Sequence, residues 1–156
     1  MPQLLVNPGF ETGLLAPWTS TGIVNVLTAP PDAAHTGTKS VELDSDTTGA
    51  SISQIVFFPI LPGSSLRLSF FLRRDAGFST DITATVTNFG IPVLTISIPA
   101  ASNPEEEENE WAYYEGYSSP LPFGAPFGVT VTVSIAGVPK GDAQVVFDDI
   151  FLFPFF

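Results

Sequence analysis

The stretch Asp81-Ile82-Thr83-Ala84-Thr85-Val86-Thr87 carries apolar side chains at alternate positions, separated by threonine. Successive side chains of an extended strand point to opposite faces, so this alternation buries one face and leaves the other in water. Most of its residues are β-branched, which favours extended backbone. The stretch therefore predicts a half-buried antiparallel strand.

Similar stretches recur along the chain at roughly the 8–12-residue spacing of β-sandwiches. The last of them is apolar on both faces and is expected to run centrally. No stretch shows helical periodicity over a dozen residues, and the acidic run at 103–108 is expected to be a solvated loop or one acidic turn. We expect about ten strands in two antiparallel sheets. The other expected strands cover 23–27, 39–44, 51–58, 66–72, 93–98, 111–117, 129–135 and 144–153.

The composition fits one β domain over residues 1–156. Charged residues make up only 13% of the chain, while 14 phenylalanines supply much of the expected core. The 15 prolines and 13 glycines are spread along the sequence, as turns between short strands require. Because the chain has no cysteine, neither disulfides nor a zinc site is expected.

The net charge of −11 limits the partners of the protein. So acidic a chain repels phosphate backbones, which makes nucleic-acid binding improbable. No run approaches the roughly 20 apolar residues of a membrane span. The acidic surface either attracts calcium or serves solubility alone, and the charge by itself leaves these two interpretations even.

The acidic residues do not form a recognisable catalytic centre. Glu42 and Asp44 share a strand face and Asp148-Asp149 lie together, but none has a His, Tyr or Arg partner at an informative spacing. The lone His35 cannot complete a nucleophilic triad and is expected to be a loop residue before a strand. The protein is therefore expected not to be an enzyme, with no catalytic residue.

Calcium is the more plausible chemistry, because it takes six to eight oxygen ligands from carboxylates and loop carbonyls. Glu11 lies in an N-terminal loop and Asp148-Asp149 in the last strand. The first and last strands of a jelly roll often neighbour each other, which would bring these acids together. Two unrelated surface acids remain the simpler interpretation of the spacing.

Several ordered blocks resemble the galactose-binding-like jelly roll of carbohydrate-binding modules. In that family a structural calcium sits between the first and last strands. The resemblance implies Glu11 and Asp148 as ligands, helped by main-chain oxygens near Lys39. The blocks are Asn7-Pro8-Gly9-Phe10-Glu11 with Trp18, 35–43, 53–56, 61–70, Trp111 with Tyr113-Tyr114, and 146–152.

A narrower resemblance involves the acidic segment before Trp111, the stretches 118–120 and 137–140, and the closing Asp148-Asp149. These are similar to a domain of spore-surface proteins in Bacillus-type bacteria, where collagen-like repeats usually follow. This chain departs from that pattern because it has no such repeat. Met1 also leads directly into Leu4-Leu5-Val6 without a signal peptide, which suits assembly from a mother cell. The resemblance implies a location on a spore surface or outside the cell.

Sugar binding requires exposed aromatic rings with polar groups nearby. Both tryptophans are expected at packing positions, which leaves Tyr113, Tyr114 and Tyr117 as candidate platforms. Tyr113 and Tyr117 share one strand face, and Tyr114 points the other way. Cross-strand packing is the simpler role for these rings. A carbohydrate-binding module recognising a polysaccharide or glycan is therefore the alternative function.

The C-terminal stretch ends on Phe151, Phe153, Phe155 and Phe156. Because termini are normally polar, these rings are expected either to fold onto their own sandwich or to dock on a neighbouring copy. We expect the second, and hence a non-catalytic structural surface module that assembles into a homo-oligomer or filament through these phenylalanines.

Overall fold

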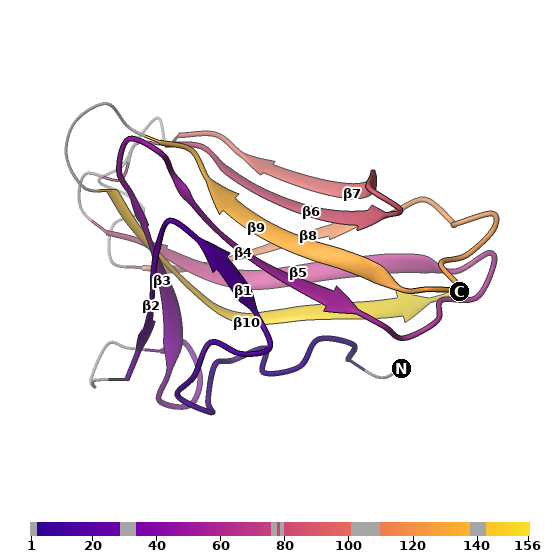
Figure 1. The fold of residues 1–156 in the computed structure, drawn as a ribbon, viewed down its shortest axis with the longest axis horizontal. Helices are drawn as coiled ribbons and strands as arrows, with labels where there is room; N and C mark the ends of the chain where they lie inside the picture. The colour runs from indigo at the N-terminus through magenta and orange to yellow at the C-terminus, as the bar shows by residue number, and fades with distance from the viewer. Residues whose placement is uncertain (1–2, 29–33, 76–77, 79, 101–109, 138–142) are drawn as a thin grey trace.

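The computed structural model describes the chain except for residues 1–2, 29–33, 76–77, 79, 101–109 and 138–142. Its regular structure is entirely β, as Figure 1 shows, and no described helix is long and apolar enough to cross a membrane. In chain order the strands are β1 (Thr19–Thr21), β2 (Ile23–Leu27), β3 (Ser40–Ser45), β4 (Ala50–Val56), β5 (Ser65–Arg74), β6 (Ile82–Asn88), β7 (Ile91–Ile98), β8 (Trp111–Tyr117), β9 (Val129–Ile135) and β10 (Ala143–Phe155).

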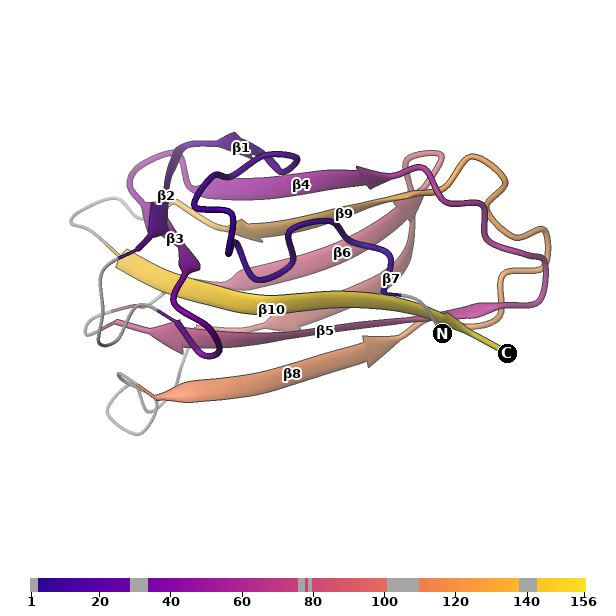
Figure 2. The same cartoon turned by 90° about the horizontal axis from the view of Figure 1, so that it is seen from below.

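The ten strands form two sheets of five, packed face to face as Figure 2 shows. One sheet has the order β1-β4-β9-β6-β7 and the other the order β2-β3-β10-β5-β8. Every strand pairing is antiparallel. The expected fold class, an all-β jelly-roll sandwich of two antiparallel sheets, is confirmed.

The core lies between the sheets and follows from the alternation seen in the sequence. In β6, Ile82, Ala84 and Val86 are buried while the threonines between them are half-exposed. The second sheet contributes larger side chains, among them Phe70 and Phe147, which are fully buried and in edge-to-face contact. Full burial of one such side chain stabilises the fold by about 1.5–3 kcal/mol, so the phenylalanines contribute strongly.

Strand β10 runs through the middle of its sheet, between β3 and β5, as its apolar composition predicts. Its pairing with β5 shifts register between Asp148 and Phe151, and Asp149 has a φ of 50°. This is a β-bulge, a local irregularity that adds a residue to one strand. The N-terminal segment lies alongside, because Leu4 N donates to Leu152 O at 2.9 Å.

The structure differs from the sequence expectations at a few element boundaries. It adds β1, whose three residues are all exposed and therefore carry no alternation to detect. It also extends the last strand to Phe155, which places most of the C-terminal aromatic stretch inside the sheet. The acidic run at 103–108 lies outside the described residues.

Candidate functional site

The outer face of the sheet β2-β3-β10-β5-β8 carries an unusual set of aromatic and arginine side chains. Four cross-strand pairs between β5 and β8 follow one another along it. At roughly 3.4 Å per residue this row extends about 20 Å. We call this surface, together with the side chains of β10 beside it, the aromatic face. The pairs are Arg67 with Tyr117, Ser69 with Glu115, Phe71 with Tyr113, and Arg73 with Trp111.

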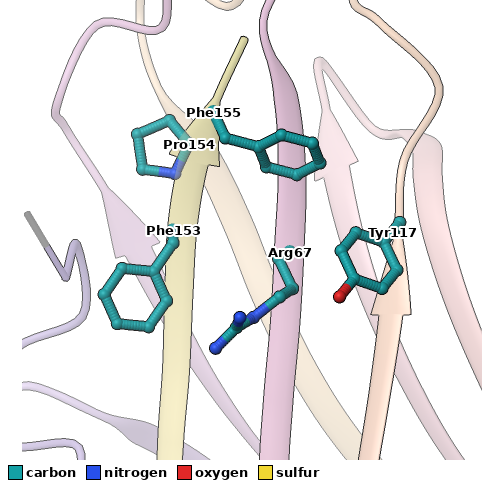
Figure 3. Close-up of a pocket in the computed structure, with 5 residues that line it drawn as sticks. All are labelled: Arg67, Tyr117, Phe153, Pro154 and Phe155. Carbon is teal, nitrogen blue, oxygen red and sulfur yellow. The ribbon is translucent and has the colours of Figure 1, made fainter. Parts of the chain in front are cut away.

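One end of the aromatic face is hollowed into a groove of about 390 Å³, which we call the Arg67 groove. Figure 3 shows that three neighbouring strands form it: Arg67 from β5, Tyr117 from β8, and Phe153, Pro154 and Phe155 from β10. The Arg67 guanidinium lies 5.3 Å from the centre of the Phe153 ring. The Tyr117 and Phe155 rings meet edge to face at 5.8 Å. The groove thus combines flat apolar walls with one cation.

The aromatic face continues to a second cluster around His35, which comes from the loop before β3. The imidazole stacks on Phe71 with ring centres 3.6 Å apart, and it meets Trp111 edge to face with ring centres 5.6 Å apart. Its Nδ1 lies 2.8 Å from Asp149 Oδ2. The guanidinium of Arg73 covers Trp111 at 5.4 Å. The ring of Phe71 and the carboxylate of Asp149 thus hold the His35 imidazole in place.

Polar groups lie between these two aromatic clusters. The Tyr113 hydroxyl donates a hydrogen bond to Glu115 Oε2 at 2.9 Å. Burial and this hydrogen bond to Glu115 both raise the pKa of Tyr113, which stays protonated at neutral pH. Hydroxyl, carboxylate and guanidinium groups beside exposed rings can hydrogen-bond a polar ligand while the rings stack on its apolar faces.

The three tyrosines of β8 lie on the strand faces that the sequence predicts. Tyr113 and Tyr117 are both exposed on the aromatic face, whereas Tyr114 points inward and stacks on Phe70 with ring centres 6.0 Å apart. Trp18 is buried, as a packing role requires. Trp111 also packs, but on the outer face, where its half-buried ring lies under the Arg73 guanidinium, and sequence reasoning missed this placement. Strand parity with Tyr113 and Tyr117 would have identified it.

Sequence reasoning also missed His35 and Arg67 as members of this surface. His35 is a loop residue before a strand, as expected, but it is separated from Asp149 by 114 positions in the chain. No local pattern signals such a contact. Arg67, in contrast, shares strand parity with Phe71 and Arg73, and that signal was available.

The predicted calcium ligands Glu11 and Asp148 do meet at one corner. A Cβ on Gly9 would lie 3.5 Å from Asp148 Oδ1 and 3.7 Å from Glu11 Cγ. Glu11 Oε1 accepts hydrogen bonds from the main-chain N–H groups of Thr38 and Lys39 at 2.9 and 3.0 Å. Burial acts to raise the pKa of Glu11, but these two hydrogen bonds, a third from the Thr38 side chain and the Lys39 charge together outweigh it and the pKa is lowered.

Asp148 closes the other side of the same loop. Its Oδ2 accepts hydrogen bonds from the N–H groups of His35 and Thr36 at 2.8 and 3.1 Å, and its Oδ1 accepts one from Asp149 N at 2.8 Å. The side chain is fully buried, and burial together with the Asp149 charge raises its pKa to about 6, although the hydrogen bond from Thr36 opposes this. The two carboxylates therefore fasten the loop at 35–39 to the N-terminal segment and to β10.

The ligand types at this corner suit Ca²⁺, which prefers carboxylate and carbonyl oxygens. Glu11 Oε2 and Asp148 Oδ1 each accept a single hydrogen bond and keep acceptor capacity. Within the described parts of the chain no three His, Cys, Asp or Glu residues are placed to hold a metal ion together. Main-chain oxygens, such as that of Lys39, would have to complete the coordination.

The four phenylalanines predicted for assembly fall into two groups. Phe151, Phe153 and Phe155 are half-buried on β10 and belong to the aromatic face, so they fold onto their own sandwich. Phe151 and Phe153 also pack against each other, with ring centres 6.0 Å apart. Phe156 is different, because 80% of it is exposed beyond the end of the strand.

Two carbohydrate-binding modules are similar to this chain along its whole length. TmCBM61, solved in complex with β-1,4-galactotriose, is 28% identical over 98% of this chain and 99% of that chain, with a TM-score of 0.71. A family 16 carbohydrate-binding module is 21% identical over 96% of this chain and 99% of that chain, with a TM-score of 0.65. The fold of this protein is that of such modules.

The same fold also occurs in enzymes. A cyclase from Fischerella sp. TAU has a TM-score of 0.74 at 12% identity, covering 99% of this chain and 97% of that chain. No protein-family model and no curated protein sequence matches this chain. None of the three similar structures connects it with spore-surface proteins. The similarities therefore favour the carbohydrate-binding alternative over the assembling surface protein.

Proposed function

We propose that this protein is a non-catalytic carbohydrate-binding module that binds a glycan along its aromatic face. The observation that carries the proposal is the Arg67 groove, where the exposed Tyr117 ring and the phenylalanines of β10 surround a guanidinium. Aromatic rings can stack on the apolar faces of sugar rings, and the guanidinium donates hydrogen bonds to sugar oxygens. The row of side chains from Tyr117 to Trp111 gives room for an oligosaccharide.

The similarity to TmCBM61 supports β-1,4-galactan as the first ligand to test. Wild-type protein is expected to be retarded in an affinity gel containing this galactan and to give a saturable isotherm by calorimetry. Tyr117→Ala is expected to weaken binding about tenfold, which corresponds to 1.4 kcal/mol. The galactan chain length is expected to stay unchanged after incubation, because we propose no catalysis.

Phe127→Ala is the matched control for this experiment. Phe127 is more exposed to solvent than Tyr117 but lies away from the aromatic face, so its loss is expected to leave galactan binding unaltered. Equal loss in both variants, or no retardation of the wild type by galactan or by any other glycan of a broad panel, would contradict the proposal. Shortened galactan would contradict its non-catalytic part.

We also propose that Ca²⁺ binds at the corner formed by Glu11 and Asp148, with main-chain oxygen from Lys39. The Glu11 side chain and an Asp148 carboxylate oxygen both lie beside Gly9, which supports this site. Calcium at a hundredfold excess over its dissociation constant would stabilise the fold by about 2.7 kcal/mol. Wild-type protein should then melt several degrees higher in CaCl₂ than in EDTA, and Glu11→Gln should abolish the difference. Identical melting in both solutions would rule the site out.

A glycan-binding role suits a protein at a cell surface or outside the cell, and we propose that location. The narrower assignment to a spore surface rests on the sequence resemblance alone. Antibody labelling of intact spores tests the spore-surface location, and detection in culture supernatant of the source organism tests the extracellular one. Labelling confined to the cell interior would contradict both.

A further inference from the structure

The end of the sandwich at which β4, β6, β8 and β10 finish carries a large exposed apolar surface, which we call the tip. It consists of the loops at 57–64, 89–90 and 118–128 together with Ile91 and Phe156, and Figure 1 shows these segments gathered at the end marked C. Phe123 is 88% exposed and Phe57 is 79% exposed. The other exposed apolar side chains of the tip are Phe58, Leu61, Phe89, Ile91, Phe127 and Phe156.

The tip is a defined surface, because hydrogen bonds join its loops. Ile60 and Ala125 exchange two main-chain hydrogen bonds of 2.9 and 2.8 Å. The N–H of Gly63 donates to Leu121 O at 2.7 Å, and the Asn88 side chain donates to Gly124 O at 3.1 Å. These bonds fix the positions from which the phenylalanines project.

Aromatic contacts and shared grooves make the surface continuous. The rings of Phe89 and Phe127, from different loops, meet edge to face at 5.8 Å. One shallow groove runs between Phe89 and Phe123, and another joins Phe58 and Leu61 to Phe156. The three loops and the last residue therefore present one apolar area.

The size of this area is that of a protein interface. With about 200 Å² for each free aromatic side chain, the tip exposes roughly 1,000 Å² of apolar side chain. The largest apolar patch of a typical monomer is about 300–600 Å², whereas a stable interface buries about 800 Å² on each partner. The tip exceeds the first value and meets the second.

The charge distribution indicates which partner fits. No residue of the three tip loops is charged, so they lack the Lys and Arg that attract anionic lipid surfaces, and they also lack the Trp that is enriched at membrane interfaces. The opposite end carries Asp44, Asp46, Asp75, Asp81 and Glu110. The 13 residues of β10, at about 3.3 Å each, separate the two ends by roughly 40 Å, several Debye lengths at physiological salt.

We propose that the tip is a self-association surface through which two copies join end to end. This orientation buries both apolar areas and keeps the two acidic ends as far apart as the molecule allows, whereas parallel side-by-side packing would bring them together. Because the same surface serves both copies, the pair closes by two-fold symmetry. The proposal does not rest on glycan binding, but the tip adjoins the Arg67 groove, since Pro154 lines both that groove and the one beside Phe156. Galactan binding is therefore measured separately on the tip variants.

Sedimentation velocity of the full chain from about 1 to 200 μM tests this proposal, a range that covers weak and moderate dimers. Wild-type protein is expected to pass from monomer to dimer, and Phe123→Asp and Phe89→Asp are each expected to raise the dimer dissociation constant at least tenfold. Leu14→Asp introduces the same charge at an exposed leucine away from the tip and is expected to leave the dimer intact. Unchanged melting temperatures confirm that the variants are folded.

Three results would overturn the proposal. The first is a wild-type monomer at every concentration, and the second is a dimer that neither tip variant weakens. The third is a monomer that co-sediments with phosphatidylcholine vesicles through Phe123, which would assign the tip to lipid. Retention of galactan binding by monomeric Phe123→Asp would show that the two proposals stand or fall separately.

Discussion

At one end of the sandwich the described loops and strand ends carry Asp46, Asp75, Asp81 and Glu110, and at the other end they carry phenylalanine and proline without one charged side chain. Both ends consist of connections between the same antiparallel strands. At the apolar tip, main-chain hydrogen bonds between the loops fix the positions from which the phenylalanine rings project into solvent. At the acidic end, the nearby acids Glu42, Asp44 and Asp75 repel one another in partly buried positions. We therefore expect substitutions that disturb loop packing to change stability at the tip, and pH and salt concentration to change stability at the acidic end.

The raised pKa of Glu42 indicates that the crowded carboxylates of the acidic end lower the stability of the fold. Burial is the main cause that raises the pKa of Glu42 to about 7, and the neighbouring carboxylates of Asp44 and Asp75 add to it, while Arg73 acts in the opposite direction. Burial also raises the pKa of Asp75. A carboxyl group whose pKa rises on folding lowers the free energy of unfolding at any pH high enough to ionise that group in the unfolded chain.

The largest effect is expected for a change of shape at the tip. Gly128 has a φ of 86°, and a Cβ there would overlap the main-chain oxygen of Val56. Gly128→Ala is therefore expected to lower the free energy of unfolding by about 3 kcal/mol and the melting temperature by about 10 °C. Thermal and urea unfolding measure both.

Gly63→Ala provides the control, because Gly63 has almost the same φ of 85° but open space around it. It carries only the backbone strain and should cost about 1 kcal/mol. Equal losses at the two glycines would mean that close packing between the tip loops contributes nothing.

A smaller effect of opposite sign is expected at the acidic end. Between pH 4.5 and 7 the folded protein keeps a proton on Glu42 that the unfolded chain releases, so wild-type stability falls as the pH rises across this range and levels off above 7. After allowance for solvent screening, Glu42→Gln should stabilise the protein by about 1 kcal/mol at pH 8 and by almost nothing at pH 5. Melting curves at the two pH values test this.

The matched variant is Glu110→Gln, which removes the same charge from an exposed position. It should alter the free energy of unfolding by no more than about 0.5 kcal/mol at either pH. A gain from Glu42→Gln that persists at pH 5 would show that the carboxylate is not the cause.

The smallest effect concerns salt. Raising NaCl from about 0.02 to 0.5 M shortens the Debye length from roughly 20 to 4 Å and screens repulsion among the acids. Wild-type stability should rise by about 0.5 kcal/mol, and Glu42→Gln should gain less. Urea unfolding at both salt concentrations measures the gain in stability of the wild type and of Glu42→Gln. An identical gain in the two proteins would show that repulsion at Glu42 does not cause the salt effect.

The fold could be predicted from the sequence because alternation is a local property. The stretch at 81–87 indicates which side chains of β6 are buried without knowledge of its partners. Strand β1 escaped detection because its three exposed residues have no buried face to mark. The closeness of Glu11 and Asp148 was also predictable, since the first and last segments of this fold lie together.

The candidate site was less predictable because it depends on contacts between distant segments. The stacking of His35 on Phe71 requires Asp149 to hold the ring from a third part of the chain. The C-terminal phenylalanines were expected to contact another copy because termini are normally polar, and the sequence did not show that the last strand continues to Phe155. Phe156, the last of them, lies at the tip, where we propose that self-association takes place.

The bulge in β10 has a consequence for how the surface of this fold can change. Before it, the odd-numbered Val145 and Phe147 enter the core, and after it the even-numbered Ile150 and Leu152 do so. The added residue thus turns the rest of the strand over and displays Phe151, Phe153 and Phe155 on the outer face. Deleting one codon at the bulge would exchange the two sets, so length changes at this position offer evolution a route to a new binding surface without any substitution.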